Sequence, residues 1–119
     1  MTAATEVTTH PVTAARAELA DIRAETWPAS EEARWAISWA CDSLENAILT
    51  YGRLARGQMR PSEVIAPGMA AWHEDPEAKA LEYVAGQCGD LVKAAWELLA
   101  EYRRREAKGI ERAKGWMGR

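Results

Sequence analysis

Two pairs of carboxylates stand at helical spacing, and their chemistry is the easiest to state from the sequence. Asp42 and Glu45 lie three residues apart, and Glu97 and Glu101 lie four apart. Residues at these spacings share one face of a helix, so each pair can present oxygen ligands to Mg²⁺. The same spacing suits solvated helix faces on which carboxylates pair with cations. The second interpretation requires nothing else from the chain, and we therefore expect no metal and no cofactor.

The segment Gln87-Cys-Gly-Asp90-Leu-Val resembles the last helix of the MazG-type nucleotide pyrophosphatases, which carries a Glu-x-x-Asp metal motif. Gln87 stands where that motif has Glu, and Asp90 supplies its Asp. The pair Glu31-Glu32 is similar to the paired acids of that family, although the third acid is not at the expected step. The resemblance implies a magnesium-dependent nucleotide pyrophosphatase, which we keep as one alternative function.

The cysteines and histidines do not form a ligand set. Two cysteines alone cannot complete a tetrahedral zinc site, and His10 and His73 lack ligand spacing. Cys41 and Cys88 both lie on apolar stripes, so we expect two buried thiols, with a disulfide between them as the alternative. The chain has no Gly-x-Ser-x-Gly motif and no glycine-rich phosphate loop. Without a catalytic set, an enzyme is the less favoured class.

Six tryptophans are many for 119 residues, and two of them stand out by position. Trp35 and Trp39 fall nearly opposite the apolar stripe of their own predicted helix. One interpretation is that the first predicted helix packs against them as part of the core. The other is an aromatic surface that binds a partner or a second copy, because tryptophan often dominates interface energetics. Trp72 is a further candidate for this surface.

The charge of the chain is divided between an acidic body and a basic end. Residues 1–102 hold eight Lys/Arg and sixteen Asp/Glu, a net charge of −8, whereas residues 103–119 hold seven and two, a net charge of +5. Clustered arginines with an aromatic residue can bind nucleic acid, an anionic membrane surface or an acidic protein. They also suit the carboxyl end of a helix, where cations favour the dipole. The candidate residues are Arg103, Arg104, Arg105, Lys108 and Trp116.

Apolar residues spaced by three and four predict the elements that position these side chains. One such stripe is Ile37, Cys41, Leu44, Ile48, Tyr51 and Ala55, and a second is Leu81, Val84, Cys88, Leu91, Ala95, Leu98 and Tyr102. A shorter stripe begins after Thr13, a candidate cap, and Trp27-Pro28 ends it. Ser30 caps the second helix, and Gly57 ends it. The predicted helices are about 14–26, 31–56 and 76–107.

The predicted fold is therefore all-α, a small three-helix bundle whose last two helices form a long antiparallel hairpin. We expect residues 1–12 to be a flexible lead, residues 13–108 to be one helical domain, and residues 109–119 to be a frayed basic tail. Asp75-Pro76-Glu77 opens the third helix. The connection over residues 57–75, with one turn at 69–73, is long enough to suggest a functional loop.

The leading functional hypothesis is a non-enzymatic protein–protein interaction module that uses the aromatic helix face. It would be a small regulatory, adaptor or assembly protein, with a bacterial, phage or plasmid source, and it would bind a protein partner or a second copy. Nucleic-acid binding through residues 103–119 is the second hypothesis. No apolar run of about 18 residues is present, so we expect no membrane span and a cytoplasmic location.

Overall fold

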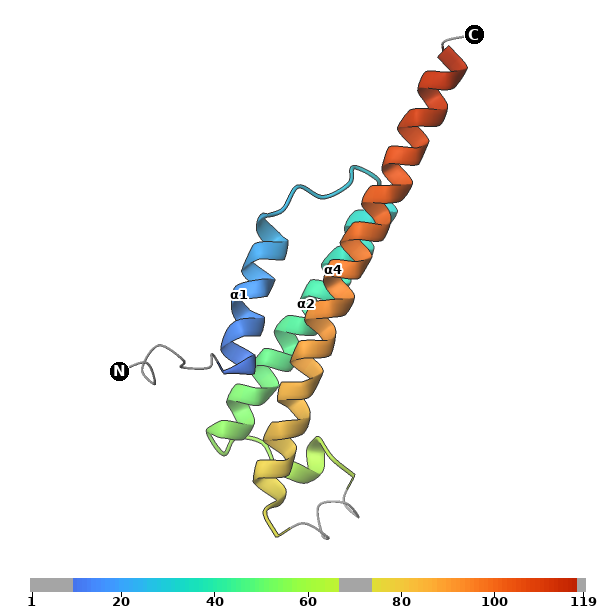
Figure 1. Ribbon diagram of the computed structural model, residues 1–119. Helices are drawn as coiled ribbons and strands as arrows, with labels where there is room; N and C mark the ends of the chain where they lie inside the picture. Colours follow the sequence, from blue (N-terminus) through green and yellow to red (C-terminus); the bar gives the residue numbers. More distant parts are fainter. Residues whose placement is uncertain (1–9, 67–73, 118–119) are drawn as a thin grey trace, which may run out of the picture.

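Three α-helices packed side by side make up the body of the protein. The computed structural model describes residues 10–66 and 74–117. Helix α1 spans Pro11–Ala24, α2 spans Glu31–Ala55 and α4 spans Pro76–Met117. In Figure 1, α1 and α4 run in one direction and α2 runs in the other, so α2 and α4 form the antiparallel hairpin. The predicted all-α three-helix bundle is confirmed.

The core is built from the predicted apolar stripes. Helix α2 contributes Ile37, Cys41, Leu44 and Ile48, α4 contributes Val84, Cys88, Ala95 and Leu99, and α1 contributes Ala15, Leu19 and Ile22. The buried face of α4 is rotated slightly from the prediction, because Leu99 is fully buried whereas Leu98 is half-buried. The rotation follows from packing, since α4 contacts both α1 and α2 and must bury side chains toward each of them.

Helix α2 begins and ends where its sequence predicts. The Ser30 hydroxyl accepts a hydrogen bond from the Ala33 N–H at 3.1 Å, which caps the amino end. At the carboxyl end Gly57 adopts a φ of 72°. The N–H groups of Gly57 and Gln58 donate to the carbonyls of Leu54 and Arg53 at 3.1 and 2.8 Å. This Schellman arrangement satisfies the last carbonyls of the helix and requires a left-handed residue, which glycine supplies without strain.

The start of α1 differs from the prediction. The cap is His10 and not Thr13: its Nδ1 atom accepts a hydrogen bond from the Val12 N–H at 3.1 Å. Pro11 occupies the first helical position, where its fixed φ suits the helix and its missing N–H costs nothing. The helix also ends earlier than predicted, at Ala24, and residues 25–30 form the linker to α2.

The connection between α2 and α4 contains a short 3-10 helix, η2, at Pro61–Glu63. After it, Ile65 is buried in the core, so this part of the connection closes the end of the bundle. Asp75 caps α4 as predicted, because its Oδ1 atom accepts a hydrogen bond from the Ala78 N–H at 3.0 Å. The predicted turn at 69–73, and with it Trp72, lies outside the described residues.

Helix α4 continues to Met117, about ten residues beyond its predicted end, so the residues expected to form a frayed tail are helical up to that point. Gly109 and Gly115 do not end the helix, because the residues around them are mostly strong helix formers, which maintain it. In Figure 1 this red end of α4 projects past α1 and α2. We call residues 107–117 the overhang. Within the described residues, no helix is long and apolar enough to cross a membrane.

Candidate interaction surface

Trp35 and Trp39 stand on the outer side of α2, away from both neighbouring helices. Their exposed fractions are 69% and 65%, the largest among the exposed large hydrophobic side chains of the described chain. The rings stack on one another with centroids 5.8 Å apart and an interplanar angle of 22°. The interpretation that α1 packs against them is therefore wrong. Helix α1 instead lies along a flank of α2, where Arg23 meets Glu45 and Asp42.

Acidic side chains border this aromatic pair. Glu31 precedes Trp35 by four residues and Asp42 follows Trp39 by three, so all four side chains share the outer face of α2. All four are exposed. We call these four residues the Trp face. It combines an apolar centre of stacked rings with a negatively charged border, which suits a basic, partly apolar partner.

The carboxylates of the first predicted metal pair are engaged by an arginine. The Arg23 guanidinium hydrogen-bonds both carboxylate oxygens of Glu45 at 3.4 Å and lies 3.5 Å from Asp42. The hydrogen bond to Glu45 raises the pKa of Arg23. The side chains of Asp42 and Glu45 are 65% and 47% exposed, so their ion pairs stabilise the contact between α1 and α2 only weakly. The pair joins α1 to α2.

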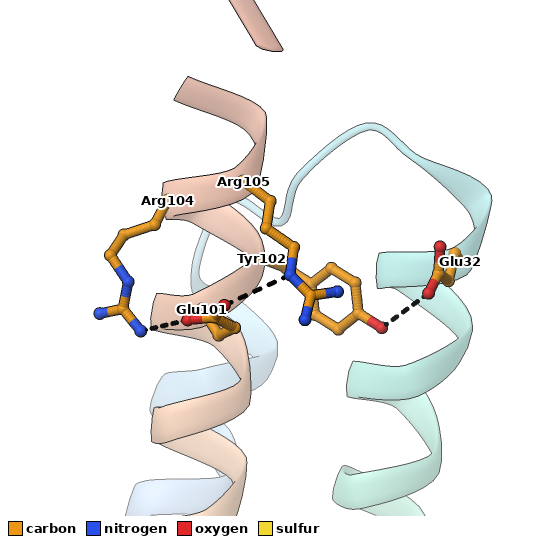
Figure 2. Close-up of polar contacts among 5 residues, drawn as sticks. All are labelled: Glu32, Glu101, Tyr102, Arg104 and Arg105. Carbon is orange, nitrogen blue, oxygen red and sulfur yellow. Dashed lines mark hydrogen bonds and ion pairs between the residues drawn. The ribbon is translucent and has the colours of Figure 1, made fainter. Parts of the chain in front are cut away.

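The second pair is likewise used by cations of its own helix. Glu97 lies 4.0 Å from Lys93, and Glu101 binds both Arg104 and Arg105 (Figure 2). The hydrogen bond from Arg104 lowers the pKa of Glu101, and Arg105 adds to the effect. Across residues 10–66 and 74–117, no three His, Cys, Asp or Glu side chains gather in a metal-binding group.

The acids suggested by the pyrophosphatase resemblance do not meet. Asp90 and Gln87 line an open depression of about 470 Å³ between α2 and α4, together with Ser43, Asn46 and Leu91. Asp90 is the only carboxylate among these lining residues. Glu32 instead accepts a hydrogen bond from the Tyr102 hydroxyl at 3.2 Å. Tyr102 is twelve residues after Asp90, or about 18 Å along the helix. The two motifs therefore stand at separate levels of the bundle.

Both cysteines are free and buried, as one of the two predicted alternatives has it. Burial raises the pKa of each thiol. A buried neutral thiol is a poor nucleophile and a poor metal ligand, because both roles need the thiolate. Cys41 and Cys88 therefore act as small apolar core side chains.

The three consecutive arginines are all engaged, Arg103 by the linker after α1 and the other two within α4 (the latter in Figure 2). Arg103 donates to Glu25 at 2.9 Å and to the Thr26 carbonyl at 2.8 Å, both in the linker that follows α1. Arg104 and Arg105 bind Glu101, and the Arg105 guanidinium also lies 5.0 Å above the Tyr102 ring. The same linker is held once more by Glu106, which accepts from the Ala29 N–H at 2.8 Å.

Beyond Glu106 the described side chains of α4 are all exposed. They include Lys108 from the predicted basic set, together with Arg112 and Lys114. Ile110 is half exposed, at 50%, and is not among the residues predicted for an interaction surface. The spacing in the sequence indicates its position: Ile110 follows Leu99 by eleven residues, or about three turns, so it continues the buried side of α4. Trp116 lies within the helical span, but its side chain is outside the described part.

Comparison with protein-family models, with curated proteins and with solved structures finds no match to this chain. The exposed surfaces described above are therefore the features from which a function can be proposed.

Proposed function

We propose that this protein is a non-enzymatic interaction module, a small regulatory, adaptor or assembly protein, and that it contacts its partner through the Trp face. The observation that carries the proposal is the stacked pair Trp35 and Trp39, exposed by 69% and 65%. Core packing does not account for the pair, because the bundle buries its stripes without it. Burying two such rings in a complex would stabilise that complex by several kcal/mol, at about 25 cal/mol per Å².

Nucleic-acid binding is the weaker candidate, because the clustered arginines are engaged within the protein. A phosphate-binding surface needs cations that are free to neutralise phosphates. Arg103 binds the linker, and Arg104 and Arg105 bind Glu101 within the same helix. The three consecutive arginines of the predicted basic segment therefore already have carboxylate or carbonyl partners within the protein. No observation favours the nucleotide hydrolase, and we do not propose it. A cytoplasmic location stays a prediction from the sequence.

The test is a double variant, Trp35→Ala with Trp39→Ala, in the full chain. Because both side chains are exposed, we expect the helical content by circular dichroism to stay unchanged and the thermal midpoint to move by only a few degrees. We expect the mass of the native complex in an extract of the source cell to fall to that of the free chain.

A matched control is the variant Leu49→Ala with Tyr83→Ala, which removes two other exposed large side chains, 47% and 48% exposed. It should leave the native complex intact. If the tryptophan variant loses its helicity, the pair belongs to the core and the proposal fails. The proposal also fails if the tryptophan variant retains the full complex.

A further inference from the structure

The overhang and the Trp face are two exposed surfaces of the described chain, and they are complementary in charge. The Trp face carries Glu31 and Asp42 beside its rings, and Asp42, which lies 3.5 Å from Arg23, is still 65% exposed. The overhang carries three cations, Lys108, Arg112 and Lys114, against the single acid Glu111. Two Trp faces, or two overhangs, would repel each other. An overhang and a Trp face would attract each other.

The side chains of the overhang are arranged to complement the apolar rings and the acids of the Trp face. Ala107, Ile110 and Lys114 are spaced by three and four residues and so share one side of the helix. That side offers a small residue, a half-exposed apolar side chain and a cation. The apolar side chain can pack on the stacked rings, and the ammonium group can lie against a ring face or beside an acid.

The length of the overhang also matches the length of the Trp face along α2. Glu106 is held to Ala29, two residues before α2, so the overhang starts near the level where α2 begins. Its eleven residues, 107–117, extend about 16 Å beyond that level. The first eleven residues of α2 occupy the same length and contain both tryptophans. The overhang of an inverted copy would therefore span both tryptophans of the Trp face.

We propose that the occupant of the Trp face is the overhang of a second copy of this chain, in a two-fold dimer. The inference rests on the proposed function and names its partner. Two-fold symmetry makes the contact reciprocal, because each copy lends its overhang and receives the other. Each tryptophan pair offers roughly 300 Å². Two such contacts, with the matching overhang surfaces, reach roughly 1,200 Å², the lower limit for a stable interface. A single contact would not.

The experiment measures the mass of the full chain by sedimentation equilibrium, for two variants alone and mixed. Ile110→Glu damages the overhang and leaves the Trp face intact. Trp35→Ala with Trp39→Ala does the reverse. We expect the wild-type chain to be a dimer that weakens as salt rises, and each variant alone to be a monomer. The equimolar mixture should regain a heterodimer, because one intact overhang then meets one intact Trp face.

A second pair of variants covers the case in which Ile110→Glu alters the helix. Lys114→Ala and Lys108→Ala remove the same charge from the same segment. Lys114 shares the side of Ile110, whereas Lys108 points about 160° away from it. We expect Lys114→Ala to weaken the dimer about tenfold, because each dimer loses the contact twice. Lys108→Ala should weaken it by less than about threefold through charge alone.

Three results would overturn the inference: a monomeric wild-type chain at every concentration, a dimer that Ile110→Glu leaves unchanged, or variants that do not rescue each other on mixing. None of these tests the interaction module itself. If the tryptophan variant loses a cellular complex that Ile110→Glu retains, the proposed function stands and the partner is a different protein. If the tryptophan variant retains that complex, the proposed function fails whatever the mass measurements show.

Discussion

The polar and aromatic side chains divide into those that hold the bundle together and those that the bundle leaves free. Arg23 and Arg103 each connect two elements, and Tyr102 connects α4 to Glu32 at the start of α2. In each case a residue that could be taken for part of a site is used within the fold. Trp35 and Trp39 contact each other and are otherwise exposed, and this difference makes them the candidates for function.

The buried thiols give a prediction at the scale of single residues. Since burial raises the pKa of Cys41 and Cys88 above the unfolded value of about 8.5, the folded chain keeps both thiols neutral where the unfolded chain ionises. Their contribution to stability is complete below that pH and is lost as the pH rises through the folded pKa. We expect the free energy of unfolding, from urea titrations, to fall between about pH 8 and pH 10.

The control for this effect is the double variant Cys41→Ala with Cys88→Ala. It should be less stable at neutral pH, because it leaves cavities in the core, but its stability should change less over the same alkaline range. An equally steep fall in the variant would assign the effect to other groups. In the native chain we also expect neither thiol to react with a thiol reagent until denaturant is added.

At the scale of elements, local chemistry sets most of the helix ends. Ser30 and Asp75 cap two helices through side-chain oxygens, and Gly57 ends α2 through its left-handed backbone. His10 caps α1 in the same way with a ring nitrogen, which the usual capping preferences do not include. The carboxyl end of α4 has no such signal within the described residues, and the helix continues into solvent.

Two glycine substitutions should therefore change the free energy of unfolding in opposite directions. Gly57→Ala places a side chain at a φ of 72°, and we expect it to lower the free energy of unfolding by about 1 kcal/mol. Gly86→Ala lies in the middle of α4 with open space around a new Cβ atom, and it should raise that free energy by about 0.5–1 kcal/mol. Chemical denaturation of both variants measures the difference. A gain from Gly57→Ala would contradict the Schellman assignment.

At the scale of the whole molecule, the linker at residues 25–30 marks the level along α4 at which the bundle ends. The part of α4 before that level packs in the bundle, and the part after it does not. Arg103 and Glu106 hold this linker against α4, and the Trp27 Nε1 atom holds it to the Ile22 carbonyl at 2.8 Å. Past that level α4 has no neighbouring element in Figure 1. The division is one of packing, since the helix itself is continuous.

Two truncations test this division. A chain that ends at Glu106 loses only exposed side chains among the described residues, so its free energy of unfolding should change by no more than about 0.5 kcal/mol. It should nevertheless be monomeric. A chain that ends at Tyr102 also loses the Arg103 and Glu106 contacts, and it should be less stable by about 1–3 kcal/mol. Equal losses in both truncations would mean that the overhang is part of the folded core.

The fold follows from the sequence because its signals are local and repeated. The spacing of Ile37, Cys41 and Leu44 defines a buried stripe whatever covers it, and the caps at Ser30 and Asp75 act on their own helix ends. The boundary errors have the same origin: residues 109–117 contain two glycines that suggest fraying, while the surrounding helix formers decide otherwise.

The sequence by itself thus determined the helices, their apolar stripes and the antiparallel hairpin. Only the tertiary structure decided that α1 packs beside Glu45 and not over Trp35, and that Arg103 binds the linker. The physical reason is that periodicity states which sides of a helix are apolar, but a helix with two apolar sides does not say which of them a neighbour covers. Charge likewise marks residues 103–119 as basic, but only the contacts separate Arg103, which joins α4 to the linker, from the exposed cations on the overhang.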